Sequence, residues 1–310
     1  MSIESETSTV QFNGQVAIVT GAGNGLGRQH ALALAKRGAK VVVNDLGGAR
    51  DGTGGSVSAA QAVVDEIKAA GGEAMANGAS VTDYAAVTAM VQQAIDAWGR
   101  VDILINNAGI LRDKSFSKME IDDFRLVMDV HLMGAVHCCK AVWPHMNAQK
   151  YGRIILTTSS SGLYGNFGQT NYGAAKMALV GLMQTLSIEG AKNDIRVNCL
   201  APTAATRMTE DLMPEAVLQA LQPQAVTPAV LVMASRHAPN RAILCAGAGT
   251  FEAAHITLTQ GVWLGHDAQT PERLLERLDE VTARAGDQVP QSGAAQGSNE
   301  MGKAMAAAGR

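Results

Sequence analysis

The sequence has few charged residues and no excess of either sign. Of its 310 residues only 17% are Asp, Glu, Lys or Arg, and 25 basic against 28 acidic residues give a formal net charge of −3. Together with 47% hydrophobic residues, this composition argues against a disordered chain, a collagen or a long coiled coil. Because no basic surplus is available for phosphate backbones or anionic lipids, we expect neither nucleic acid nor a membrane as a partner.

Signals for metal binding, disulfides and targeting are also missing. The 4 cysteines include no CxxC pair and the 7 histidines include no HExxH, so we expect a reducing compartment and no metal site. No uninterrupted apolar run approaches the ~18 residues of a membrane span. The first ten residues do not form a secretory leader, and the final AGR is not an SKL-type peroxisomal address. The sequence therefore predicts a cytoplasmic protein.

From Gln15 onward, short β-branched runs alternate with longer segments of helical pattern. The runs are continuously apolar, which is typical of parallel strands covered on both faces by helices. The expected strands are 16–20, 41–45, 73–77, 101–106, 153–159, 195–201 and 242–247. The expected helices are 25–38, 56–71, 83–98, 120–148 and 172–190. We predict an α/β fold: a Rossmann-like, doubly wound parallel sheet in three layers.

The end of the chain differs from the rest. Residues 270–286 predict one amphipathic helix, with Thr270 as N-cap and Pro271 at the first helical position. Residues 287–310 carry little β-branched or aromatic content and are expected to wrap a neighbour or stay disordered. We therefore predict a single domain over 1–265, followed by a C-terminal helix and tail over 266–310.

A glycine-rich segment, TGAGNGLG at 20–27, joins the first expected strand to the first expected helix. Such a turn brings unpaired backbone N–H groups and the positive end of a helix against a pyrophosphate, and a Cβ would block the approach. Asp45 follows Gly21 by 24 positions at the end of the second strand. A carboxylate there would bind the adenosine ribose and repel a 2′-phosphate, so we predict NAD; the alternative is a simple turn residue.

Later strand ends would complete this cofactor site, because a doubly wound sheet binds its ligand outside the carboxyl ends of its strands. The predicted cofactor-binding residues are Gly21, Gly23, Asn24, Gly25, Leu26, Gly27, Asp45, Ser80, Val81, Asn107, Ala108, Gly109, Tyr172, Lys176, Thr203 and Thr206. The glycine-rich segment at 46–58 is either functional or a plain flexible connection.

Ser159, Tyr172 and Lys176 form the predicted catalytic set. Tyr172 and Lys176 are four positions apart and share a helix face, whereas Ser159 ends the fifth strand. A phenol of pKa ~10 is a poor base near neutrality, and lowering it by ~3 units takes roughly 4 kcal/mol. We expect the Lys176 ammonium and a positive nicotinamide ring to favour the phenolate, so that Tyr172 acts as base. Ser159 would orient the substrate oxygen.

Together, TGAGNGLG (20–27), NNAG (106–109) and the catalytic set resemble the short-chain dehydrogenase/reductase family over about residues 12–250. Four segments are more closely similar to its (3R)-hydroxyacyl-CoA dehydrogenase members, found in peroxisomal multifunctional enzymes of type 2. They are VVVNDLGG (41–48), NNAGILRDKSF (106–116), YGNFGQTNYGAAK (164–176) and APTAATRMTEDLMPE (201–215). The resemblance implies NAD-dependent oxidation of a (3R)-3-hydroxyacyl-CoA to the 3-oxoacyl-CoA by a homodimer, with a tetramer as the alternative.

Two positions depart from the family pattern. His131 stands where the family usually has an asparagine, so we consider it as a fourth catalytic residue, with plain packing as the alternative. Pro202-Thr203 replaces the usual Pro-Gly. Two other functions stay open: a hydroxysteroid or other secondary-alcohol dehydrogenase without CoA, and an NAD-sensing or scaffold protein. The apolar residues around 208–233 are either a lid over an acyl chain or core.

Overall fold

The structure is a computed structural model that describes residues 9–48, 51–205 and 214–309. Its contacts divide the chain into two units between Ala253 and Ala254, whereas the sequence analysis placed the boundary after residue 265. The first unit contains the glycine-rich segment at 20–27 and all the candidate catalytic residues. The two units are described separately below.

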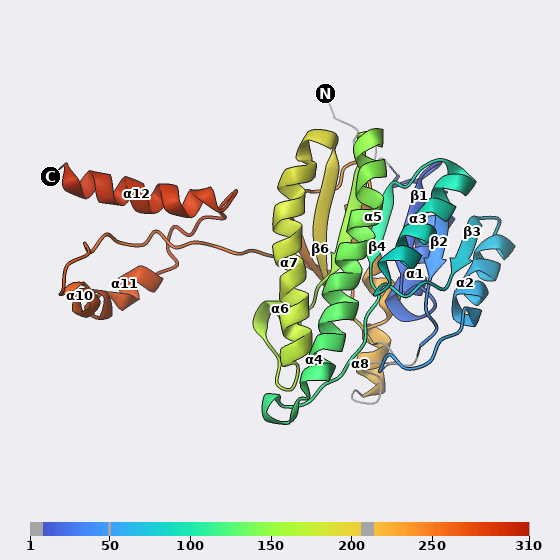
Figure 1. Cartoon of the computed structure of the whole chain (residues 1–310), viewed down its shortest axis with the longest axis horizontal. Coiled ribbons are helices and arrows are strands. Elements are labelled where there is room, and N and C mark those ends of the chain that lie inside the picture. The colour runs from blue at the N-terminus through green and yellow to red at the C-terminus, as the bar shows by residue number, and fades with distance from the viewer. Residues whose placement is uncertain (1–8, 49–50, 206–213, 310) are drawn as a thin grey trace. The chain divides into compact units, whose positions relative to one another are not determined.

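The first unit is built on a sheet of eight strands (Figure 1). The strands are β1 (Val16–Thr20), β2 (Lys40–Asn44), β3 (Glu73–Asn77), β4 (Ile103–Asn106), β5 (Gly152–Thr157), β6 (Ile195–Thr203), β7 (Ile243–Gly247) and β8 (Thr250–Ala254). They lie in the order β3-β2-β1-β4-β5-β6-β7-β8, and every neighbouring pair from β3 to β7 is parallel. The predicted doubly wound parallel sheet is confirmed.

Helices cover both faces of this sheet, which is why β1, β4 and β5 are buried along their whole length. On one face α1 packs against α2 and α9, and on the other α3 packs against α5 and α4 against α7. Figure 1 shows α4, α5 and α7 in front of the sheet. The helices are α1 (Gly25–Lys36), α2 (Ser58–Ala69), α3 (Tyr84–Trp98), α4 (Ile121–Met128), α5 (Gly134–Gln149), α6 (Ser160–Tyr164), α7 (Thr170–Gly190), α8 (Glu215–Ala220) and α9 (Thr227–Ala234). Single 3₁₀ turns are η1 (Phe116–Lys118), η3 (Ala191–Asn193) and η5 (Pro223–Ala225).

The helix predicted over 120–148 is interrupted. A π-helical turn, η2 (Asp129–Met133), lies between α4 and α5 and contains His131. Such turns are rare and often mark functional sites, and apolar spacing alone does not reveal them. In α9, Leu231 and Met233 are buried in the hydrophobic core. This favours a core role for these two residues over a role in a lid above an acyl chain. Residues 208–213 of that hypothesis lie outside the described residues.

Two stretches, Ile121–Gln149 and Glu215–Ala234, are long and apolar enough to cross a membrane by length and hydropathy. Core helices of globular proteins pass the same test. Within these stretches α5 packs on β4 and β5, and α9 packs on β5 and β6, so the buried apolar residues of these two helices face the sheet.

The second unit contains α10 (Thr270–Glu276), α11 (Leu278–Thr282) and α12 (Ala294–Ala308). The prediction of a single helix over 270–286 was wrong, because Arg277, between α10 and α11, adopts a non-helical φ of −109° and ψ of 21°. Residues 287–310 were expected to wrap a neighbour or stay disordered, and the second alternative is wrong because Ala294–Ala308 form α12. Alanine, the strongest helix former, supplies six of the fifteen residues of α12.

Candidate active site

The turn between β1 and α1 requires glycine. Gly21 and Gly25 have φ of +62° and +53°, in the left-handed region that other residues rarely adopt. A Cβ on Gly21 would lie 2.8 Å from Cα of Ala108, and one on Gly27 would collide with the Gly21 carbonyl. Asn24 is extended and precedes the first residue of α1, so the helix starts at the carboxyl end of β1. The predicted residues Gly21 to Gly27 therefore present a helix N-terminus to the crevice above the sheet.

Asp45 joins this turn to the loop after β2. Its Oδ2 accepts a hydrogen bond from the Gly23 N–H at 2.8 Å, and its Oδ1 accepts one from the Gly47 N–H at 2.7 Å. A Cβ on Gly23 would lie 2.8 Å from Asp45 Oδ2, so the carboxylate reaches the turn only because residue 23 is glycine. Each carboxylate oxygen keeps further lone pairs. This cradle fits the adenosine-ribose end of a dinucleotide.

The loop after β4 holds the turn in place. The Asn107 side-chain amide donates to the carbonyl oxygens of Thr20 and Gly21, both at 3.0 Å. The Thr20 hydroxyl oxygen in turn accepts from the backbone N–H of Asn107 at 3.0 Å and of Ala108 at 3.1 Å. Asn107 thus shapes the turn with its side chain. Thr20 was missed in the sequence, where only its place directly before the glycines could have indicated a role.

Ser159, Tyr172 and Lys176 come together at the carboxyl end of β5. Ser159 is 9% exposed and precedes α6, and its Oγ accepts from the Ser161 N–H at 3.2 Å. Tyr172 lies in the first turn of α7, and its phenol is close enough to the Ser159 side chain for Ser159 to affect its pKa. The Lys176 ammonium donates to the Thr157 carbonyl at 2.6 Å and lies 5.4 Å from the centre of the Tyr172 ring. The spacing of the three residues in the sequence therefore corresponds to one cluster.

Burial dominates the titration of this cluster. It raises the pKa of Tyr172, with a smaller opposing effect from the Ser159 side chain and a further increase from the charge of Asp113. Burial also lowers the pKa of Lys176 to about 7. In the chain by itself, Tyr172 is therefore protonated at neutral pH.

His131 lies directly beside Tyr172. The two rings are 5.2 Å apart at nearly right angles, and His131 Nε2 lies 2.8 Å from the Ile110 carbonyl oxygen and 3.1 Å from the Ile110 N–H. Burial, and then the charge of Lys176, lower the pKa of His131 to about 3, so this imidazole is neutral at pH 7. A Cβ on Gly109 would collide with the His131 ring, so glycine at 109 allows this arrangement.

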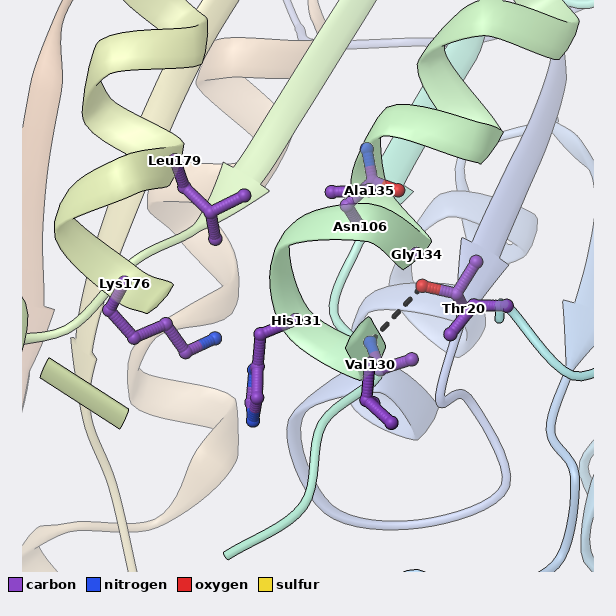
Figure 2. A pocket seen from close by; sticks show the side chains of 10 residues that line it. Thr20, Asn106, Val130, His131, Gly134, Ala135, Lys176 and Leu179 are labelled. Atoms are coloured by element: carbon purple, nitrogen blue, oxygen red, sulfur yellow. Dashed lines mark hydrogen bonds between the residues drawn. The ribbon is translucent and has the colours of Figure 1, made fainter. Parts of the chain in front are cut away.

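A small cavity lies behind these side chains, with room for about one water molecule. Figure 2 shows Lys176 and His131 pointing into it from two different helical segments. His131 Nδ1 is buried and finds no hydrogen-bond partner within the described part of the chain. Lys176 can donate three hydrogen bonds, so both groups have capacity for a further partner in this space.

The remaining predicted residues lie at strand ends, as expected for a crevice above the sheet. Ser80 and Val81 follow β3; the hydroxyl of Ser80 is 2.8 Å from that of Thr82, and Val81 borders the cavity. Thr203 is the last residue of β6 and is exposed. Thr206 lies outside the described residues.

Known proteins share both the sequence and this architecture. Residues 15–216 match the family described as short chain dehydrogenase. The chain is 49% identical to peroxisomal multifunctional enzyme type 2 of Drosophila melanogaster, over 87% of this chain and 45% of that protein. It is 51% identical to a short-chain type dehydrogenase/reductase of Mycobacterium tuberculosis, over 76% of this chain and 82% of that protein. Against the peroxisomal hydratase-dehydrogenase-epimerase of Saccharomyces cerevisiae it is 49% identical, over 88% of this chain and 30% of that protein.

Solved structures give the same result. The full-length Drosophila enzyme superposes with a TM-score of 0.77 and 38% identity, over 94% of this chain and 49% of that one. A 7α-hydroxysteroid dehydrogenase in complex with NADH and a 7-oxo bile acid gives a TM-score of 0.70 and 31% identity, over 77% of this chain and 95% of that one. The chain thus spans less than half of the Drosophila and yeast enzymes but 82% of the mycobacterial one. It belongs to the short-chain dehydrogenase family and is an oxidoreductase that acts on a CH–OH group.

Proposed function

We propose that this protein oxidises (3R)-3-hydroxyacyl-CoA to 3-oxoacyl-CoA with NAD. The observation that carries the proposal is the Ser159–Tyr172–Lys176 cluster beside the glycine turn, in a chain matched over most of its length by a multifunctional enzyme and a hydratase-dehydrogenase-epimerase. The four sequence segments that resemble (3R)-hydroxyacyl-CoA dehydrogenases support the same proposal.

Asp45 supports NAD over NADP. Its carboxylate lies against Gly23 of the phosphate-binding type of turn, where the adenosine ribose of a dinucleotide would lie. There it can accept a hydrogen bond from a 2′-hydroxyl, and it would repel a 2′-phosphate. When bound, NAD supplies the hydride acceptor and one additional positive charge.

The chain's own residues provide the proton chemistry. The Ser159 hydroxyl oxygen accepts from a backbone N–H, so its proton is available to the substrate oxygen. The Tyr172 oxygen accepts the hydroxyl proton of the substrate while the hydrogen on the carbinol carbon leaves as hydride, and the C–O bond becomes a carbonyl. A protonated Lys176 near the phenol stabilises the phenolate that this step requires.

We assign His131 a positioning role in this reaction. It is neutral, its ring packs edge-on against Tyr172 and lines the same cavity as Lys176, and its Nδ1 has no hydrogen-bond partner among the described residues. A water molecule in that cavity would link the two side chains and hold the lysine in place. Replacement by leucine should therefore lower the rate more than replacement by asparagine, which retains a hydrogen-bonding group.

We also propose a homodimer, with a tetramer as the alternative, and contacts along the two long helices predicted at 120–148 and 172–190, with purely intramolecular packing of these helices as the alternative. Sedimentation at micromolar concentration that shows only monomer would refute it. For the compartment, the cytoplasm expected from the sequence competes with the peroxisome in the names of the relatives. Imaging of the protein in a host that has peroxisomes separates the two.

One other function has a specific observation in its favour. The likeness to a 7α-hydroxysteroid dehydrogenase supports oxidation of a steroid alcohol that carries no CoA. The two functions differ in whether contacts with the CoA portion of the substrate increase the rate of oxidation. Binding energy from contacts remote from the reacting carbon can lower the barrier of the chemical step.

A substrate panel tests the proposal. The purified protein is incubated with NAD or NADP and with (3R)- or (3S)-3-hydroxyacyl-CoA of short, medium and long chains, or with free hydroxysteroids, and NADH or NADPH absorbance is followed. We expect turnover with the (3R)-thioesters and NAD. Turnover of steroids alone would favour the alternative dehydrogenase, and NAD binding without turnover of any substrate would favour a sensing protein.

A further inference from the structure

The segment after β2, described at residues 45–48 and 51–57, reaches the loop after β4. It starts at Asp45, and the carbonyl oxygen of Asp51 accepts a hydrogen bond from Nε of Arg112 at 2.8 Å. Since the strands lie in the order β2-β1-β4, a loop that joins the ends of β2 and β4 passes the end of β1, where the glycine turn lies. A Cβ on Gly52 would lie 3.3 Å from the Ile110 side chain, which confirms the close approach.

This loop is folded on itself. The Leu46 carbonyl accepts from the Ser56 N–H at 2.8 Å, which closes the base of the loop. At its far end the Asp51 carboxylate accepts from the N–H of Thr53 at 3.0 Å and from the Thr53 hydroxyl at 2.7 Å. The segment 51–57 therefore has a defined shape, and the side chain of Arg112 attaches to its far end.

Arg112 also contacts the catalytic side of the crevice. Its guanidinium forms a salt bridge with Asp123 of α4, at 3.1 Å from NH1 to Oδ1. Its carbonyl oxygen accepts from the side chain of Asn171 at 3.0 Å, and the Asn171 side-chain oxygen accepts from the Tyr172 N–H at 2.7 Å. Asn171 is fully buried, so this connection is rigid.

We infer that residues 51–57 form a clasp over the bound dinucleotide and that Arg112 is the positioning residue that holds the clasp closed. The inference rests on the proposed NAD-dependent function. The arginine suits this task because one rigid guanidinium binds two partners at once, the Asp123 carboxylate and the Asp51 carbonyl. The single hydrogen bond between Arg112 and Asp51 can open and close in each catalytic cycle, as release of the reduced cofactor requires.

Two variants separate the clasp from simple folding effects. Arg112→Ala removes both contacts, whereas Arg112→Lys keeps a positive charge opposite Asp123 but lacks the second arm for Asp51. Arg125→Ala is the matched control, because Arg125 forms an exposed salt bridge with Asp122 on the same helix at 3.2 Å. NADH dissociation is measured by stopped-flow displacement, and amide hydrogen exchange of residues 51–57 is followed with and without NADH.

We expect NADH to dissociate roughly tenfold faster from both Arg112 variants, since a hydrogen bond to a charged group is lost. Arg112→Lys should keep the wild-type melting temperature, and Arg125→Ala the wild-type dissociation rate. NADH should protect residues 51–57 from exchange in the wild type and less so in the variants. Dissociation within twofold of wild type in both Arg112 variants, or unchanged protection, would overturn the clasp. A wild-type protein that does not bind NADH would instead contradict the proposed function.

Discussion

Replacement of the buried Lys176 by methionine should reduce the rise in the free energy of unfolding that we expect as the pH increases above about 7. Lys176 is 3% exposed, and burial lowers its pKa from 10.5 to about 7. Below about pH 7 the lysine is protonated in both the folded and the unfolded chain, and the folded chain carries the full cost of a buried ammonium. As the pH rises from about 7 to 10.5, the folded chain releases its proton first, so this cost decreases.

The expected magnitude follows from the two pKa values. At 1.36 kcal/mol per unit, the lowering costs up to roughly 5 kcal/mol at low pH. Between about pH 7 and about pH 9, the stability of the wild type relative to Lys176→Met should rise by about 2 kcal/mol. The lost hydrogen bond to Thr157 and the altered packing add an offset, but this offset does not depend on pH.

Urea unfolding of both proteins at several pH values between these limits measures the difference. Lys140→Met, at an exposed position of α5, is the control and should differ from the wild type by a constant amount. A Lys176→Met curve that runs parallel to the wild type over this range would refute the assignment of a depressed lysine pKa. A wild type that loses stability relative to the variant as pH rises would reverse the sign and refute it as well.

Three further substitutions test the site. Tyr172→Phe should lower the oxidation rate at least roughly a thousandfold, as expected for a lost general base, while NADH affinity by fluorescence titration stays within about threefold; an undiminished rate would exclude Tyr172 as the base. Asp45→Ser should lower the preference for NAD over NADP roughly tenfold in kcat/KM, because the carboxylate that repels a 2′-phosphate is gone; an unchanged ratio would remove Asp45 from cofactor selection. Gly109→Ala places a Cβ against the His131 ring and should destabilise the protein by about 1–3 kcal/mol in urea. The control Gly181→Ala, where a Cβ meets open space, should not destabilise it, and equal effects of the two would contradict the close contact.

The sheet and the predicted catalytic cluster could be derived from the sequence because both depend on where strands end. Apolar runs locate the strands to within a few residues, and parallel strands place their carboxyl ends at one edge. Asp45 and Ser159 lie at the ends of such runs, and Tyr172 lies in the first turn of the next helix. Their proximity therefore follows from the topology alone, without knowledge of any side-chain contact.

The features that could not be predicted depend mainly on contacts between residues far apart in the sequence. Thr20 binds the backbone of residues 87 and 88 positions away, and Arg112 binds a carbonyl 61 positions away, at sites where no periodic pattern exists. The π-helical turn that carries His131 was missed because one extra residue in a turn leaves the apolar spacing of 120–148 nearly unchanged. β8 was missed because four of its five residues are exposed, so its sequence lacks an apolar run.

The burial of Lys176 connects stability with the proposed chemistry. An ammonium in water has little effect on a phenol at this distance, because the solvent screens the charge. Behind Tyr172, with the Thr157 carbonyl as its acceptor, the same charge acts through a medium of lower dielectric constant and affects the phenol more strongly. The same burial lowers the pKa of Lys176 to about 7, so that the lysine is fully charged only below neutrality, whereas the phenolate is favoured at higher pH. Because these two requirements oppose each other, the oxidation rate should pass through a maximum as the pH is varied. Replacement of Lys176 by methionine should remove the decrease on the alkaline side of this pH profile, along with most of the activity. A residual activity with an unchanged alkaline limb would show that a different group sets it.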